Sequence, residues 1–165
     1  MESSGAFHSP TKGEMGLAGV VSEIADFVEE DPASFYRLVI GTDSQTRRVG
    51  EGAQINFVTA IVIHRIGHGG RYFYRINKQN NSFQLRDKIY TETLFSLDLA
   101  EKFVPEIRKV ISPKRYDLEI HIDVGSLGPT RDMIREVVGM VQGNGYTAKT
   151  KPEAYGAFVV ADRYT

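Results

Sequence analysis

Tyr36-Arg37-Leu38-Val39-Ile40-Gly41-Thr42-Asp43-Ser44-Gln45 is the stretch on which the fold depends. Its first half is an apolar run interrupted only by Arg37, which is the pattern of a strand buried on both faces. Asp43 follows where this run ends, so we expect its carboxylate at the end of a central strand, where open sheets carry their chemistry. The alternative is that Thr42-Asp43-Ser44 is only a turn, because Asp and Ser readily bond their own backbone.

The composition limits the class of protein. A chain of 165 residues is long enough for one domain with a real core, and we expect a flexible N-terminus over residues 1–12 and a single domain over 13–165. The formal net charge of -1 means that any contact with nucleic acid must come from local patches. Cysteine is absent, which excludes disulfides, thiolate zinc sites and thiol nucleophiles and fits the cytoplasm. No apolar run approaches the length of about 20 residues that a membrane span needs.

Hydrophobic periodicity predicts alternating helices and strands on either side of the opening stretch. A helix is expected from Leu17 to about Glu30, where apolar residues recur at steps of three and four. Runs rich in β-branched and aromatic residues at 54–64 and 71–76 predict two more strands, which short connections should join to the first in an antiparallel meander. The later elements are a helix over 87–111, a strand over 116–125, a helix that follows Pro129, a short strand over 146–151, and a last helix from Pro152 or, alternatively, a strand through 158–160.

Acidic residues stand at the ends or starts of several of these elements. The strand over 116–125 should return parallel to the first strand by a right-handed crossover, which places Asp123 at the same edge of the sheet as Asp43. Glu92 lies early in the helix over 87–111, although the macrodipole favours glutamate there whatever the function. We interpret His121 as a buried histidine with a hydrogen-bond partner rather than a ligand, and His68, among glycines, as a residue of a solvated turn.

The order of these elements resembles the ribonuclease H-like fold. More closely, Gly-Thr-Asp-Ser-Gln at 41–45, His-Ile-Asp-Val-Gly at 121–125, Lys-Pro at 151–152 and the closing Ala-Asp-Arg-Tyr-Thr resemble the YkuK-like family of small bacterial proteins. The resemblance implies an α/β fold with a five-stranded mixed sheet, in which strands one to three are antiparallel and strands four and five run parallel to the first. Helices would cover both faces, with an extra helix at the N-terminus.

The same resemblance implies a metal site. Asp43, Glu92, Asp123 and Asp162 match the positions of the metal-binding carboxylates, and hard oxygen ligands select Mg²⁺ or Mn²⁺. Two ions held there would hydrolyse phosphodiester bonds of nucleic acid, with Asp43 bridging both, Asp123 and Asp162 on the nucleophile side and Glu92 on the leaving-group side. Glu153 is the alternative to Asp162, which near the C-terminus is otherwise an ordinary solvated charge.

Two other functions stay open at this stage. The basic residues are few and scattered, with Arg47-Arg48 and the pair Lys149 and Lys151 as the nearest thing to a surface for RNA, an RNA–DNA hybrid or structured DNA. The chain is therefore also consistent with a non-catalytic binding or scaffold protein of the same fold. Residues 41–44 and 123–126 also faintly resemble the phosphate loops of actin-like ATPases, although the chain is short for their two-domain cleft.

Overall fold

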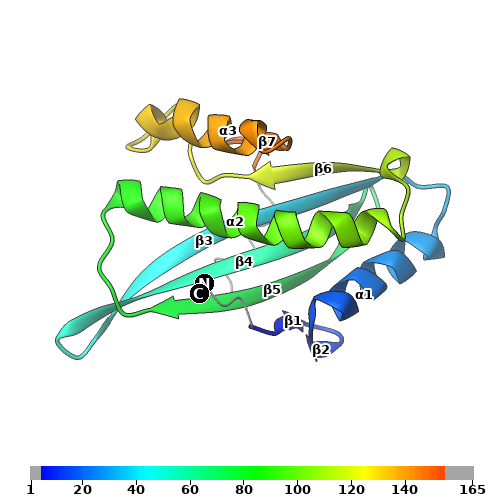
Figure 1. Cartoon of the computed structure of the whole chain (residues 1–165), viewed down its shortest axis with the longest axis horizontal. Coiled ribbons are helices and arrows are strands. Elements are labelled where there is room, and N and C mark those ends of the chain that lie inside the picture. Colours follow the sequence, from blue (N-terminus) through cyan, green and yellow to red (C-terminus); the bar gives the residue numbers. More distant parts are fainter. Residues whose placement is uncertain (1–4, 155–165) are drawn as a thin grey trace.

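The computed structural model describes residues 5–154 of the chain. Its elements follow one another in the order β1 (Phe7–Ser9), β2 (Gly13–Met15), α1 (Leu17–Glu30), β3 (Tyr36–Val49), β4 (Gly52–Arg65), β5 (Gly70–Gln79), α2 (Leu85–Arg108), η1 (Pro113–Arg115), β6 (Tyr116–His121), η2 (Arg131–Met133), α3 (Ile134–Gly143) and β7 (Thr147–Lys149) (Figure 1). The two η elements are single turns of 3-10 helix that lead into β6 and α3.

All the strands within residues 5–154 belong to one mixed sheet of order β2-β1-β5-β4-β3-β6-β7. β3, β4 and β5 form the expected antiparallel meander, and β6 pairs parallel with β3 as the crossover through α2 requires. β7 then pairs parallel with β6. The predicted pairing of these five strands is confirmed, so Asp43 on β3 and Asp123, two residues after the end of β6, come from neighbouring parts of the sheet.

The prediction of five strands was wrong, because β1 and β2 add two more at the β5 edge. His8 of β1 lies opposite Tyr74 of β5, and Phe7 is buried in the core with 2% of its surface exposed. Phe7–Ser9, within the segment 1–12 that was expected to be a flexible N-terminus, is thus paired into the sheet. A strand of three residues is too short to show a period of two, which is why the sequence pattern did not reveal it.

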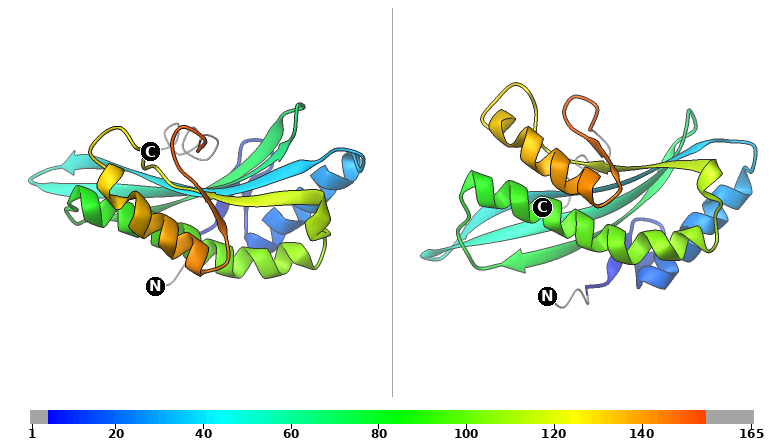
Figure 2. Two further views of the ribbon diagram at one scale, coloured as in Figure 1. Left: turned by 90° about the horizontal axis from the view of Figure 1, so that it is seen from above. Right: turned by 45° about the horizontal axis from the view of Figure 1, so that its top comes forward.

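The described helices α1, α2 and α3 lie on one face of the sheet (Figure 2). Their apolar stripes meet the inner face of the sheet in one core that includes Ile24 and Phe27 from α1, Leu99, Phe103 and Ile107 from α2, and Val137 and Val141 from α3. The resemblance implied helices on both faces, and the three described ones do not show this arrangement. Residues 151–153 form a turn and Ala154 is not helical, so no helix begins at Pro152. The remainder of the last predicted helix, and the alternative strand through 158–160, lie outside the described residues.

Arg65, the last residue of β4, ties α1 to the start of β3. Its guanidinium lies 4.1 Å from the centre of the Phe27 ring and donates hydrogen bonds to Phe27 O at 2.7 Å and to Tyr36 Oη at 3.1 Å. Tyr36 Oη in turn donates to Asp31 O at 2.8 Å, just after α1 ends. The planar guanidinium can stack on the ring and donate in its own plane at the same time.

Candidate functional site

Asp43 lies in the middle of β3 and not at its end. The parallel pairing of β3 with β6 stops at Gly41 opposite His121, whereas the antiparallel pairing with β4 continues through Asp43 opposite Val58 as far as Val49. The alternative that Thr42-Asp43-Ser44 forms a turn is wrong. Asp43 and Asp123 each follow the last parallel pair by two residues, so both reach the place where β6 leaves β3.

A cavity of about 250 Å³ lies at this place. Four parts of the chain line it: β3, the first turns of α2, the segment after β6 and the turn after β7. The lining residues are Asp43, Ser44, Leu85, Lys88, Ile89, Glu92, Asp123, Gly125, Leu127, Pro129, Thr130 and Lys151. We call it the acidic cavity. It brings together three of the four carboxylates that the sequence singled out, from positions up to 80 residues apart in the chain.

Glu92 is the most buried carboxylate of the acidic cavity, with 5% of its surface exposed. Ser44 Oγ donates a hydrogen bond to Glu92 Oε2 at 2.6 Å. Burial raises the pKa of Glu92 to about 8, and the charges of Asp43 and Asp123 add to this rise, while the Ser44 hydrogen bond and the charge of Lys88 oppose it. Glu92 therefore holds a proton at neutral pH unless another cation takes that proton's place.

A second hydroxyl contact fixes the position of α2 over β3. Thr42 Oγ1 lies 2.8 Å from Ser96 Oγ and 3.0 Å from Thr59 Oγ1, and all three residues are buried. Thr42 and Ser44 are two apart on a strand, and Ser96 and Glu92 are four apart on a helix, and both spacings measure roughly 6–7 Å. The two pairs therefore set the phase of α2 that turns Glu92 toward the acidic cavity.

The remaining carboxylates have different partners. Asp43 is buried with 8% exposed, and its Oδ1 accepts a hydrogen bond from the Ser44 N–H at 2.9 Å. Asp123 is more open, and its Oδ1 lies 2.5 Å from Lys151 Nζ in an ion pair. The sequence assigned Lys151 to a weak basic patch and to the Lys-Pro motif of the family resemblance, but not to Asp123, because no local pattern shows which carboxylate a lysine side chain will reach.

Comparison with known proteins gives the family. A family model described as ribonuclease H-like matches residues 19–165. The chain belongs to the ribonuclease H-like family. It is 34% identical over 175 aligned positions to the uncharacterized protein YkuK of Bacillus subtilis (strain 168), an alignment that covers 100% of this chain and 99% of the relative. No solved structure matches the chain.

Within this family the donors of the acidic cavity have the right chemistry for Mg²⁺ or Mn²⁺, since they are carboxylate oxygens. Their arrangement is more open than a finished metal site. Among residues 5–154, no three carboxylate or histidine side chains are placed closely enough to hold a metal ion together. Asp162 lies outside the described residues. Its proposed substitute Glu153 is exposed and is not among the residues that line the acidic cavity.

The two histidines interpreted from the sequence do not line the acidic cavity. His121 is 2% exposed, and its Nε2 lies 3.0 Å from Glu119 Oε1, while Arg37 Nε lies 3.4 Å from the other oxygen of Glu119. Burial lowers the pKa of His121. The interpretation of a buried, partnered histidine is confirmed. His68 is exposed in the β4–β5 turn, as expected.

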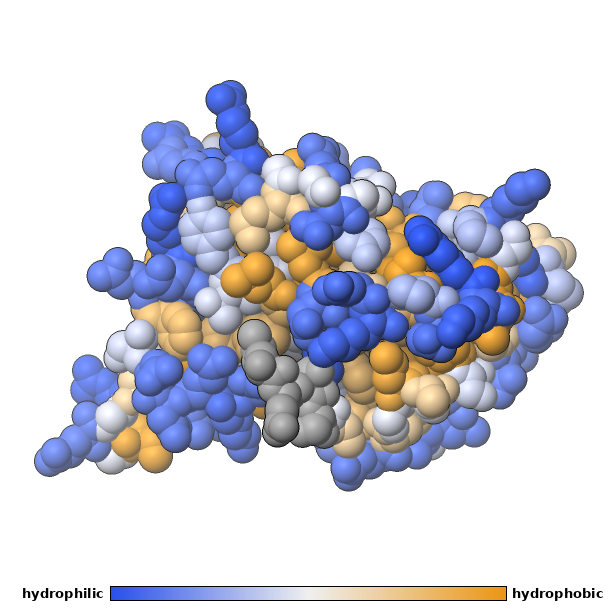
Figure 3. Space-filling model, in the orientation of Figure 1, coloured by the Kyte–Doolittle hydropathy of each residue, from blue (hydrophilic) through white to orange (hydrophobic). Residues whose placement is uncertain are grey.

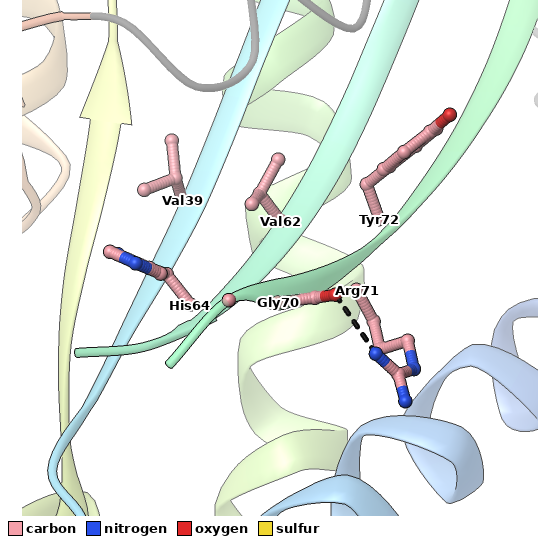
Figure 4. A pocket seen from close by; sticks show the side chains of 7 residues that line it. Val39, Val62, His64, Gly70, Arg71 and Tyr72 are labelled. Atoms are coloured by element: carbon pink, nitrogen blue, oxygen red, sulfur yellow. Dashed lines mark hydrogen bonds between the residues drawn. The ribbon is translucent and has the colours of Figure 1, made fainter. Parts of the chain in front are cut away.

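Another cavity, of about 260 Å³, lies on the sheet face opposite the described helices. Figure 4 shows Val39, Val62 and Tyr72 along its floor, with His64 at one end. The side chain of Arg71 points away from it toward α1, where its guanidinium lies 4.8 Å from the centre of the Phe27 ring. No carboxylate belongs to the lining of this cavity, so it lacks the ligands that Mg²⁺ or Mn²⁺ would need.

No helix in the described part of the chain is long and apolar enough to span a membrane.

Proposed function

We propose that the acidic cavity binds Mg²⁺ or Mn²⁺ and hydrolyses phosphodiester bonds of nucleic acid. The observation that carries this proposal is the convergence of Asp43, Glu92 and Asp123 from three separate elements on one cavity. Acidic side chains repel one another, so a structural core gains nothing by gathering them. A divalent cation removes that repulsion, and the family to which the chain belongs makes such a cation a reasonable ligand.

The electrostatics of Glu92 support a cationic ligand in particular. A carboxyl group that is 5% exposed and faces two other carboxylates is costly to ionise, which is why its pKa rises to about 8. The Ser44 hydroxyl holds Oε2 of this group in a fixed direction. A divalent ion would lower the cost of ionisation and would take the place of the proton.

Each residue has a distinct part in this proposal. Asp43 would hold the metal from β3, Asp123 from the segment after β6 and Glu92 from α2, with Asp162 as a fourth ligand that the family resemblance suggests. The bound metal would supply activation of a water molecule and neutralisation of the charge on the phosphate. Lys88 lines the same cavity and places an ammonium where an anionic substrate would enter.

Basic side chains that could contact a nucleic acid substrate also lie outside the acidic cavity, on β3. β3 and β4 continue past the site as a hairpin that projects from the body of the molecule at the lower left of Figure 1, and this projection is largely hydrophilic in the space-filling view (Figure 3). Arg47 and Arg48 are exposed near its tip, on the same strand as Asp43. Guanidinium groups there can pair with the backbone phosphates of a strand whose cleaved bond lies at Asp43.

The proposal is tested by metal binding before any substrate is known. Millimolar Mn²⁺ should raise the melting temperature of the wild type, because a ligand that binds only the folded state stabilises it by mass action. Asp43→Asn and Asp123→Asn should each remove most of this rise. Asp117→Asn is the matched control, since Asp117 is an exposed aspartate of β6 that does not line the cavity. An unmoved melting curve for the wild type would refute the metal site.

The activity itself requires a second experiment. Labelled single-stranded RNA, RNA–DNA hybrid and branched DNA should be incubated with Mn²⁺ and the wild type, with Asp43→Asn as the inactive control. Metal-dependent cleavage of any of them supports the proposal.

The ion pair between Lys151 and Asp123 favours a second candidate, a non-catalytic binding protein of the same fold, because a lysine can neutralise the site without metal. Binding of these nucleic acids without cleavage, weakened by salt, would support that second candidate.

A further inference from the structure

Lys151 occupies the acidic cavity as a cation. Its Nζ lies 2.5 Å from Asp123 Oδ1, and the residue lines the same cavity as Asp43 and Glu92. An ammonium in contact with a carboxylate neutralises the charge that a metal ion would otherwise neutralise. We infer that Lys151 is a built-in competitor of the divalent cation, which must displace the Lys151 ammonium from Asp123 in order to bind. This inference rests on the proposed metal site.

Backbone hydrogen bonds place Lys151 beside Asp123. β7 runs parallel to β6, and the two segments stay paired beyond both strands: the Ile122 N–H donates to Lys149 O at 2.9 Å, and the Lys151 N–H donates to Val124 O at 2.8 Å. The stem of Lys151 also packs on Gly125, where an added Cβ would lie 3.2 Å from Lys151 Cβ. The pairing of these two segments therefore fixes the backbone of residue 151 beside Asp123.

The side chain of Lys151 is nevertheless largely open to solvent. Its exposed fraction is 57%, against 26% for Asp123, so the ammonium can move into solvent while the backbone stays in position. The cost of breaking an ion pair that is open to water is small. The ammonium can therefore act as a replaceable counter-ion that keeps the carboxylates neutralised until a divalent cation arrives.

Charge counting gives the direction of the effect on metal affinity. The acidic cavity holds the acidic groups of Asp43, Glu92 and Asp123 together with the ammonium groups of Lys88 and Lys151. Removing the charge of Lys151 makes the cavity more negative and leaves Asp123 open to a cation, so the affinity for Mn²⁺ should rise. An ion pair of unit charges about 4 Å apart in a water-like medium is worth about 1 kcal/mol, so the expected gain when it no longer has to be broken is about fivefold.

The test is a calorimetric titration of the full chain with Mn²⁺ after treatment with EDTA. Lys151→Met keeps the aliphatic stem and should bind Mn²⁺ about fivefold more tightly than the wild type. Lys151→Arg keeps the charge and should stay close to the wild type. The matched control is Lys149→Met, because Lys149 lies in β7 outside the set of residues that line the cavity, and this change should leave the affinity unaltered.

The outcomes separate this inference from the proposed function. If Lys151→Met binds Mn²⁺ no more tightly than the wild type, Lys151 does not compete with the metal, and the metal site itself still stands. Weaker binding of nucleic acid by Lys151→Met with unchanged Mn²⁺ affinity would make Lys151 a contact for substrate phosphate and would also overturn the inference. If neither protein binds Mn²⁺, the proposed metal site and the inference are both wrong.

The ion pair can also be measured with no metal present. In EDTA, urea unfolding of the wild type, Lys151→Met, Asp123→Asn and the double variant gives a double-mutant cycle. The inference requires a coupling between the two residues that favours the folded state. Additive effects would show that the ammonium does not reside on Asp123 in solution, and they would overturn the inference.

Discussion

Glu92→Gln should remove most of the pH dependence of stability that the acidic cavity creates. Burial raises the pKa of Glu92 from its ordinary value of 4.5 to about 8 in the folded protein. Between these two pH values the folded state holds a proton that the unfolded state has lost. Stability therefore falls as the pH rises through this window, and the loss is complete above about pH 8.

The size of the effect follows from the same two values. At about 1.36 kcal/mol per pH unit, the gap between 4.5 and about 8 corresponds to about 5 kcal/mol of unfolding free energy as an upper bound. Glutamine carries no proton to lose, has the shape of the protonated acid, and can still accept the hydrogen bond from Ser44 Oγ. The variant should match the wild type near pH 5 and exceed its stability by a few kcal/mol at pH 8.

The assay is urea unfolding of both proteins from pH 5 to pH 9 in EDTA at constant ionic strength. Only the difference between the two curves is used, because other groups titrate in both proteins. Glu106→Gln is the matched control, since Glu106 is an exposed glutamate of the same helix that pairs with Lys109. Parallel curves for the wild type and Glu92→Gln would show that Glu92 is ionised at neutral pH, which would refute the electrostatic argument for the cavity.

Three further outcomes are expected for changes elsewhere in the fold. Phe103→Ala removes a fully buried ring and should lower the free energy of unfolding by about 3–5 kcal/mol in urea denaturation. Arg65→Lys should lower the melting temperature, because an ammonium cannot stack on Phe27 and donate to its carbonyl in one plane. Thr42→Val removes the hydroxyl that contacts Ser96 Oγ and should lower the free energy of unfolding by about 1–3 kcal/mol in the same urea assay. Mn²⁺ should still raise the melting temperature of this variant.

The sequence predicted the part of the site that depends on chain direction. A right-handed crossover through α2 leaves one parallel arrangement for β3 and β6, so Asp43 and Asp123 had to meet at one edge. This inference needed only strand type and handedness. Glu92 was expected early in the helix over 87–111, but the family resemblance brought it into the site, and in the structure it is one of the buried residues of α2.

What the sequence did not show depends on contacts between distant side chains. The second half of β3 is polar, and the sequence left a turn at Thr42-Asp43-Ser44 as an alternative, yet the partner strand β4 keeps β3 extended as far as Val49. The hydrogen bond from Ser44 to Glu92 depends on the rotation of α2 relative to β3, and the ion pair of Lys151 depends on a side-chain direction. No periodicity in one segment contains that information.

The greater length of β3 relative to β6 has a consequence for association between molecules. Beyond Gly41, within the described residues, β3 pairs with β4 on one side only, so a stretch that starts as a central strand ends as an edge strand. An edge of this length is a template on which another chain could add a strand. Thr46, Arg47 and Arg48 are exposed there, and charge on a strand edge discourages such addition. β6 ends before β3 does, which leaves room for the carboxylates but also exposes one edge of β3 to other chains. The charges of Arg47 and Arg48 near the tip discourage strand addition there, whether or not these residues contact a phosphate.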